Sequence, residues 1–188
     1  MIIHLEQQFT EKFVAAVGKL KLGDGLDEGA TIGPMISAKA VKDVKQLVDG
    51  AVELGASIAF ERSHELNENY LAPIVLTNVT NDMPIAQKEI FGPVSTIIPF
   101  DDEQHAIALA NDTEFGLAAY FYARDIGRIW RVAEGLDFGM VGINEGIISN
   151  AAAPFGGIKQ SGSGREGSKY GLDDYVTIKY LCMGGLGA

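Results

Sequence analysis

Two side chains near the middle of the sequence could together bind a nucleotide. Glu89 and Phe91 stand two residues apart, directly before a predicted strand. If this backbone is extended, both side chains project to the same side. The carboxylate could then accept hydrogen bonds from ribose hydroxyls while the ring packs against a flat heterocycle. The structural alternative is a charged turn beside a core phenylalanine.

Two later segments combine glycines with polar residues. Residues 154–157 and 161–166 are glycine-rich, so their backbone can approach another surface closely, and Phe155 lies within the first of them. Residues 146–150 include Ser149 and follow the end of a predicted strand, where α/β folds usually hold their sites. Both segments are candidates for ligand contacts.

Several other sequence patterns look like functional motifs but do not indicate a functional site. Residues 162–167 match G-x-G-x-x-G, but no strand precedes them and the chain has almost ended about 20 residues later, so we interpret them as a turn before a helix. His4, His64 and His105 are scattered without the spacing of metal ligands, and no serine-hydrolase elbow is present. We interpret Cys182 as a small buried hydrophobic residue rather than a nucleophile.

Composition narrows the class of protein. The chain has 188 residues, of which 47% are hydrophobic, and a net charge of −10. The negative charge disfavours binding to nucleic acid. No apolar run approaches the roughly 18 residues of a membrane span, and we expect a cytoplasmic protein without internal disulfides.

Helical and strand patterns alternate along the chain, which predicts an α/β domain with a largely parallel sheet. Ser37 is the expected N-cap of the second helix. Helices are expected at 6–19, from 37 to 55, at 102–111, 125–136 and 165–175, with a short helix or irregular segment at 83–89. Strands are expected at 57–61, 71–79, 94–100, 118–123, 140–144 and 175–183.

Together, these segments resemble the C-terminal part of an aldehyde dehydrogenase. The likeness covers nearly the whole chain and rests on residues 23–34, 89–93, 111–125 and 154–166. Residues 142–150 and 167–175 most resemble those of succinate-semialdehyde dehydrogenases. The resemblance implies a three-layer αβα catalytic-domain core over residues 1–160. It also implies a C-terminal helix and oligomerisation strand over 161–188, with the N-terminal NAD(P)-binding domain absent.

The resemblance also implies a mechanism and site residues. In the family, a cysteine thiolate attacks an aldehyde, NAD(P)+ accepts hydride, and a glutamate activates the water that releases the acid. Glu89 matches the glutamate that holds the nicotinamide ribose, and Phe91 matches an aromatic residue beside the cofactor. Ser149 matches a serine that helps bind the substrate carboxylate, and Phe155 matches a ring of the substrate tunnel.

The resemblance further implies that this chain is incomplete. The family's nucleophilic cysteine and general-base glutamate match no position here, so no catalytic residue is assigned and we expect the chain alone to be inactive, without tightly bound NAD or NADP. Residues 175–183 resemble the strand through which the family forms homo-oligomers. An autonomous, non-catalytic α/β binding or assembly module remains the alternative.

Overall fold

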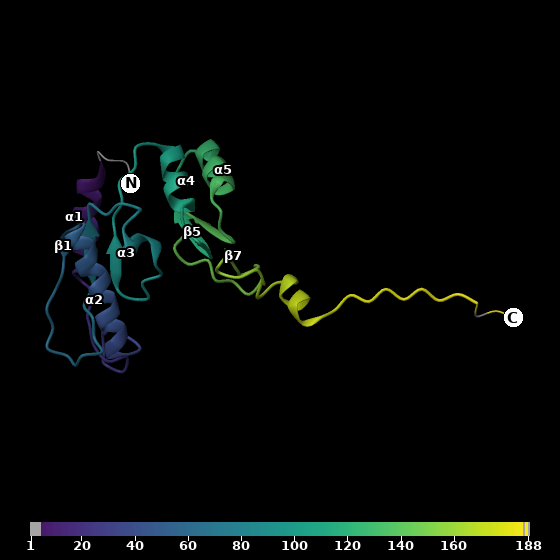
Figure 1. Cartoon of the computed structure of the whole chain (residues 1–188), viewed down its shortest axis with the longest axis horizontal. Coiled ribbons are helices and arrows are strands. Elements are labelled where there is room, and N and C mark those ends of the chain that lie inside the picture. Colours follow the sequence, from purple (N-terminus) through teal and green to yellow (C-terminus); the bar gives the residue numbers. More distant parts are fainter. Residues whose placement is uncertain (1–4, 186, 188) are drawn as a thin grey trace. The chain divides into compact units, whose positions relative to one another are not determined.

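The computed structural model describes residues 5–185 and 187. The chain divides into two compact units, Met1–Asp112 and Thr113–Ala188. The boundary predicted between residues 160 and 161 lies inside the second unit. In chain order the elements are α1 (Glu6–Val17), α2 (Ala38–Glu53), β1 (Ser57–Phe60), β2 (Ile74–Thr77), α3 (Pro84–Gln87), β3 (Val94–Thr96), α4 (Glu103–Asn111), β4 (Phe115–Gly116), β5 (Ala118–Phe121), α5 (Ile126–Gly135), β6 (Met140–Ile143), β7 (Ile158–Lys159) and the 3₁₀ helix η2 (Tyr170–Tyr175) (Figure 1).

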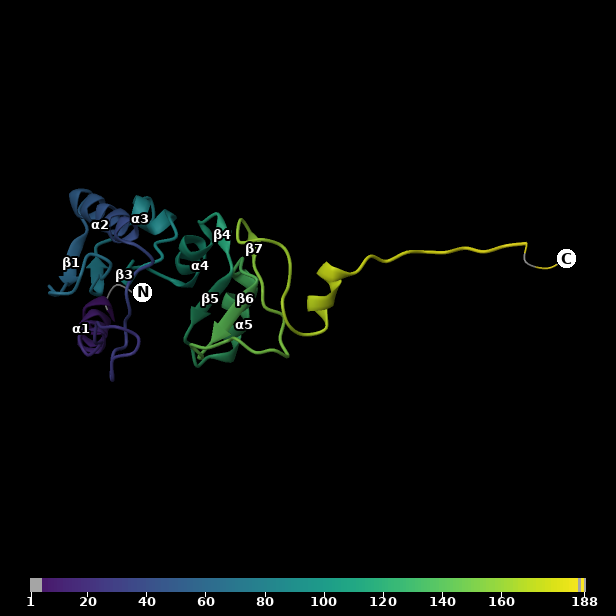
Figure 2. The same cartoon turned by 90° about the horizontal axis from the view of Figure 1, so that it is seen from below.

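Strand β2 is the centre of the first unit. It pairs antiparallel with β1 and parallel with β3. Because successive strand residues point to opposite faces, Ile74 and Leu76 pack with α2, whereas Val75 packs with Val17 of α1. Figure 2 shows α1 and α2 on opposite sides of these strands. The first unit is therefore a three-layer αβα arrangement.

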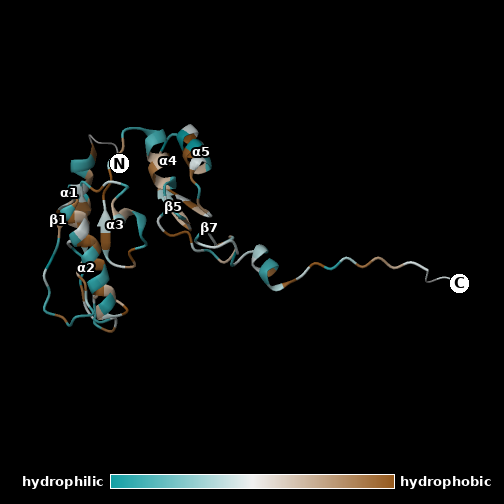
Figure 3. Cartoon of the chain, viewed as in Figure 1, coloured by the Kyte–Doolittle hydropathy of each residue, from teal (hydrophilic) through white to brown (hydrophobic). Residues whose placement is uncertain are grey.

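Helix α2 covers one face of this sheet because its apolar residues recur on one side. Val41, Val44, Val48 and Ala51 are buried. Hydrophobic and hydrophilic residues alternate along the helix in Figure 3. The Ser37 hydroxyl accepts a hydrogen bond from the Ala40 N–H at 3.1 Å, which confirms the expected N-cap.

The second unit is held together differently. Strands β5 and β6 are parallel and joined through α5, while β4 and β7 are antiparallel. Among the described residues of this unit, no apolar side chain is buried, and the buried positions are Gly116, Gly142 and Gly157. Backbone segments approach very closely instead: a Cβ at Gly139 would overlap the Gly156 carbonyl oxygen. Backbone packing and hydrogen bonds thus replace a side-chain core here.

The structure corrects the expected sheet in two respects. The described strands form three small sheets instead of one, and the sheet of the first unit is mixed rather than largely parallel, because residues 61–73 contain no crossover helix and β2 returns antiparallel to β1. The predicted strand at 71–79 begins only after Pro73, which has no N–H to donate.

The last two predicted elements also differ. The helix expected at 165–175 is reduced to the six-residue 3₁₀ helix η2, because Gly167 has φ +66° and Glu166 is hydrogen-bonded to Phe155. The strand expected at 175–183 has no partner among the described residues, and the chain after Tyr175 runs as an extended, exposed segment (Figure 1). Ile178 is 97% exposed and Tyr180 85%.

Candidate functional site

The segment that contains Glu89 and Phe91 lies on the surface of the first unit. Ile90 packs against the core beneath α2, while Glu89 is exposed and Phe91 is 81% exposed. The alternative that Phe91 is a core residue is therefore wrong. The Glu89 carboxylate has no hydrogen-bond or ion-pair partner among the described residues. Both side chains are free to meet a ligand.

The backbone at Phe91 is not extended, as the simplest interpretation required. Its φ is +48°, in the left-handed region that aromatic residues rarely adopt. The next residue explains why the segment stays in place: a Cβ at Gly92 would lie 3.1 Å from Val44 Cγ2 and 3.2 Å from Met35 Cε. The Pro93 carbonyl also accepts a hydrogen bond from the Ile74 N–H at 3.0 Å. The segment is fixed against α2 and β2.

Ser149 lies in the loop that follows β6 in the second unit. The loop begins at Asn144, whose side chain accepts from the Ala123 N–H at 2.9 Å and donates to the Ala123 carbonyl at 2.7 Å. The Glu145 carboxylate accepts from the N–H groups of Gly146 and Ile147. Ser149 itself is exposed, and its hydroxyl has no hydrogen-bond partner within the described part of the chain.

Phe155 lines a cavity of about 520 Å³ within the second unit. Its backbone is paired with Glu166 through two hydrogen bonds, of 2.9 and 2.7 Å. The other walls of the cavity come from the glycine-rich segment after β7 and from η2, and include Ser161, Gly162, Gly164, Arg165, Gly171, Asp174 and Tyr175. The aromatic ring therefore belongs to a concave surface large enough for a small organic molecule.

The four predicted site residues fall into two pairs. Glu89 and Phe91 belong to the first unit, and Ser149 and Phe155 belong to the second. Within the second unit, the Ser168 N–H donates to the Ala151 carbonyl at 2.9 Å, which links the loop of Ser149 to the wall of the cavity. Sequence reasoning treated residues 161–166 only as permissive backbone and missed Arg165, whose guanidinium binds three carbonyl oxygens of this region.

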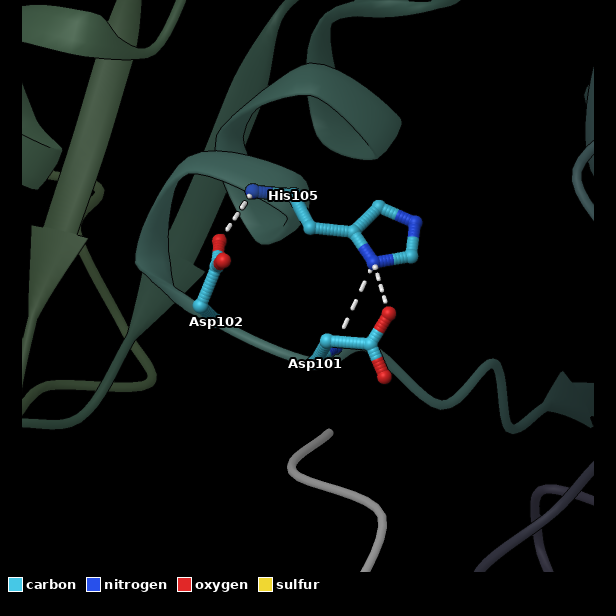
Figure 4. Close-up of polar contacts among 3 residues, drawn as sticks. All are labelled: Asp101, Asp102 and His105. Carbon is cyan, nitrogen blue, oxygen red and sulfur yellow. Dashed lines mark hydrogen bonds and ion pairs between the residues drawn. The ribbon is translucent and has the colours of Figure 1, made fainter.

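The histidine and aspartates at the start of α4 form a helix cap (Figure 4). The Asp102 carboxylate accepts from the His105 N–H at 2.9 Å, and His105 Nδ1 lies 3.2 Å from the Asp101 carboxylate. These side chains are exposed on one helix terminus. No group of three or more His, Cys, Asp or Glu suited to a metal ion occurs in the described residues.

Two further sequence interpretations have outcomes. Residues 162–167 form a loop with no strand leading directly into Gly162, as expected, but the helix expected after this turn is only the 3₁₀ helix η2. Cys182 is exposed, so its interpretation as a buried residue is wrong; no helix or strand of the described chain covers its segment. The hydrogen bond with Cys182 raises the pKa of the Tyr180 hydroxyl above its ordinary value of 10.0.

None of the helices in the described part of the chain has the length and apolar character that crossing a membrane requires.

Comparison with known proteins identifies the family of this chain. The model of the aldehyde dehydrogenase family matches residues 3–181, and this chain belongs to that family. It is 54% identical over 178 residues to a succinate-semialdehyde dehydrogenase [NADP(+)] of Escherichia coli K12, covering 94% of this chain and 37% of that protein. It is also 54% identical over 175 residues to a glutarate-semialdehyde dehydrogenase of Pseudomonas putida KT2440, covering 93% of this chain and 36% of that protein.

Solved structures agree with this assignment. The crystal structure of succinate-semialdehyde dehydrogenase from Burkholderia pseudomallei superposes with a TM-score of 0.92 at 54% identity, over 96% of this chain and 38% of that one. The fold is therefore that of aldehyde dehydrogenases. The chain spans a little over a third of the length of these relatives.

Proposed function

We propose that this chain is the C-terminal part of an NAD(P)-dependent dehydrogenase that oxidises succinate semialdehyde to succinate. The observation that carries the substrate class is the exposed hydroxyl of Ser149, which has no partner among the described residues. A free hydroxyl can donate to a substrate carboxylate. The relatives named above act on succinate and glutarate semialdehydes, and both of these aldehydes carry a carboxylate at the far end.

The residues of the first unit fit the cofactor. Glu89 offers an unpartnered carboxylate to the hydroxyls of a nicotinamide ribose, and Phe91 offers an exposed ring to the nicotinamide. NAD(P)+, when bound, supplies the acceptor for the aldehyde hydride. Phe155 supplies an apolar wall for the carbon chain of the aldehyde.

No residue of this chain is assigned as the nucleophile, so we expect the 188-residue chain alone to be inactive. The purified chain is assayed with succinate semialdehyde and either NAD+ or NADP+. Turnover above background would contradict this expectation. The assignment of residues 1–160 to the catalytic-domain core and the cytoplasmic location belong to the same proposal.

The role of Ser149 is tested in a full-length enzyme that carries this sequence. Ser149→Ala should raise the KM for succinate semialdehyde about tenfold or more, because a hydrogen bond to a charged group is lost. The KM for butanal, which has the same carbon chain without the carboxylate, should change little. An equal rise in KM for both aldehydes would show that Ser149 does not bind the carboxylate. Glu89→Gln should raise the KM for the cofactor and leave that for the aldehyde unchanged.

The exposed terminal segment supports homo-oligomer formation by strand pairing. Val176, Ile178 and Tyr180 are 62%, 97% and 85% exposed and alternate along an extended backbone without a partner in the described chain. Ile178→Pro, which removes a ladder donor, should shift the protein to monomer in light scattering, whereas Ile178→Val should not. A monomeric wild-type protein would overturn this proposal. The alternative function, an autonomous assembly module, also requires that the chain associates without being catalytically active.

A further inference from the structure

The guanidinium of Arg165 connects two parts of the glycine-rich region, the backbone at Gly157 and the turn at 163–164 directly before the arginine. Its Nη1 donates to the carbonyl oxygens of Gly157 at 2.6 Å, Gly164 at 2.8 Å and Ser163 at 3.3 Å. The backbone N–H of Arg165 donates to the Asp174 carboxylate at 3.3 Å, which ties the same residue to η2. Carbonyl oxygens bound to a cation form stronger hydrogen bonds than they form with neutral donors.

The residues next to Arg165 in the sequence contact both predicted substrate segments. Glu166 forms two backbone hydrogen bonds with Phe155, of 2.9 and 2.7 Å. Ser168 donates its N–H to Ala151, at the end of the loop that contains Ser149, at 2.9 Å. The position of residues 165–168 therefore sets the position of both segments.

Burial of apolar side chains contributes little to holding these segments in place. In the described part of the second unit no apolar side chain is buried, and Phe155 is only half-buried. The backbone at Gly156 lies directly against the arginine side chain: a Cβ there would lie 2.8 Å from Arg165 Cδ. The stem of Arg165 thus lies against Gly156 while its guanidinium binds the next residue, Gly157, and the turn at 163–164.

We propose that Arg165 is a positioning residue for the aldehyde site. By joining Gly157 to the turn at 163–164, it fixes Phe155 at the cavity wall and holds the loop of Ser149 at its far end. This inference rests on the function proposed above, because it takes Ser149 and Phe155 to contact the aldehyde. All three carbonyl contacts come from Nη1, which stands one bond further from the backbone than the lysine ammonium nitrogen, so Arg165→Lys should shorten the reach and lose these contacts.

The test compares Arg165→Lys with Arg124→Lys, which makes the same change at an exposed position of the same unit. Hydrogen exchange in the 188-residue chain should quicken at the amides of Phe155, Glu166 and Ser168 in Arg165→Lys only. In a full-length enzyme that carries this sequence, Arg165→Lys should raise the KM for succinate semialdehyde about tenfold, with kcat and the cofactor KM near wild type. In Arg165→Ala, added guanidinium below denaturing concentrations should restore the KM, and sodium chloride of equal ionic strength should not.

Each outcome tests a separate step of the proposal. Unchanged hydrogen exchange in Arg165→Lys would mean that the Arg165 contacts do not hold the two segments. Faster exchange with an unchanged aldehyde KM, or with kcat and both KM values impaired alike, overturns the positioning role. If the wild-type full-length enzyme oxidises no semialdehyde, the proposed function itself fails, and the exchange measurement alone decides whether Arg165 holds the two segments.

Discussion

At Phe91, both the backbone conformation and the exposure of the ring are unfavourable for the stability of the fold. Its φ of +48° brings the Cβ close to its own carbonyl group, and its ring is 81% exposed. A residue that gains little from burial and adopts an unfavourable backbone is more often found where a ligand is bound than where a fold is stabilised. This combination is the reason why we propose a ligand contact at Phe91.

Phe91→Gly should stabilise the protein. Glycine adopts positive φ without the Cβ cost of about 1–2 kcal/mol, although its freedom in the unfolded chain offsets part of that gain. We expect the free energy of unfolding, measured in urea, to rise by about 0.5–1 kcal/mol. Phe91→Ala is the matched control, because it removes the ring but keeps the Cβ. An equal gain in Phe91→Ala would assign the cost to the ring rather than to the backbone.

The sequence predicted some features of the candidate site and not others. The sequence predicted that Glu89 and Phe91 share one side of an extended segment; both are exposed, but the backbone at Phe91 is not extended. The turn at Phe91 was not predictable, because it depends on the approach of Gly92 to α2, an element far away in the sequence. Arg165 was missed for a similar reason: its partners are backbone carbonyls, which leave no mark in a sequence.

The starts of three helices follow local sequence signals closely. Ser37, Asp102 and Asp125 each accept a hydrogen bond from the N–H three residues later and so fix where α2, α4 and α5 begin. Figure 4 shows this contact for Asp102. Errors arise where an element needs a distant partner. Residues 175–183 have the composition of a strand, but a strand exists only where another backbone pairs with it.

Ser37→Ala should lower the free energy of unfolding of the first unit by about 1 kcal/mol, because the Ala40 N–H loses its acceptor at the start of α2. Ser37→Asp keeps an acceptor at the same place and should stay close to wild type. Urea unfolding followed by far-ultraviolet circular dichroism measures both variants. Equal losses in the two variants would mean that the hydroxyl stabilises the fold by another contact.

The two units differ in what holds them together. The first unit buries a core around β2, in which Val75 and Leu76 are 0% exposed. The second unit, over its described residues, buries only glycine backbone and leaves large apolar side chains such as Tyr122, Ile126 and Trp130 more than 60% exposed. Apolar burial is the main favourable term in folding. It therefore stabilises the second unit less than the first.

The second unit should therefore open before the first. Hydrogen exchange measured at increasing urea should show the amides of β5 and β6 losing protection at lower urea than those of α2 and β2. Leu76→Ala is the control, because it removes a fully buried side chain and should weaken protection in the first unit by about 2–5 kcal/mol without affecting the second. Simultaneous loss of protection in both units would contradict this division.

Close backbone approach in the second unit also determines which inherited changes it can accept. Gly139 faces the Gly156 carbonyl, and a Cβ at Gly157 would lie 2.6 Å from that of Ser161. Replacement of either glycine, even by alanine, requires two chain segments to separate, whereas replacement of an exposed ring such as that of Tyr122 displaces nothing. Selection for a working enzyme should therefore remove glycine codon changes from this half of the gene first, and should remove changes at valine, leucine and isoleucine codons from the other half.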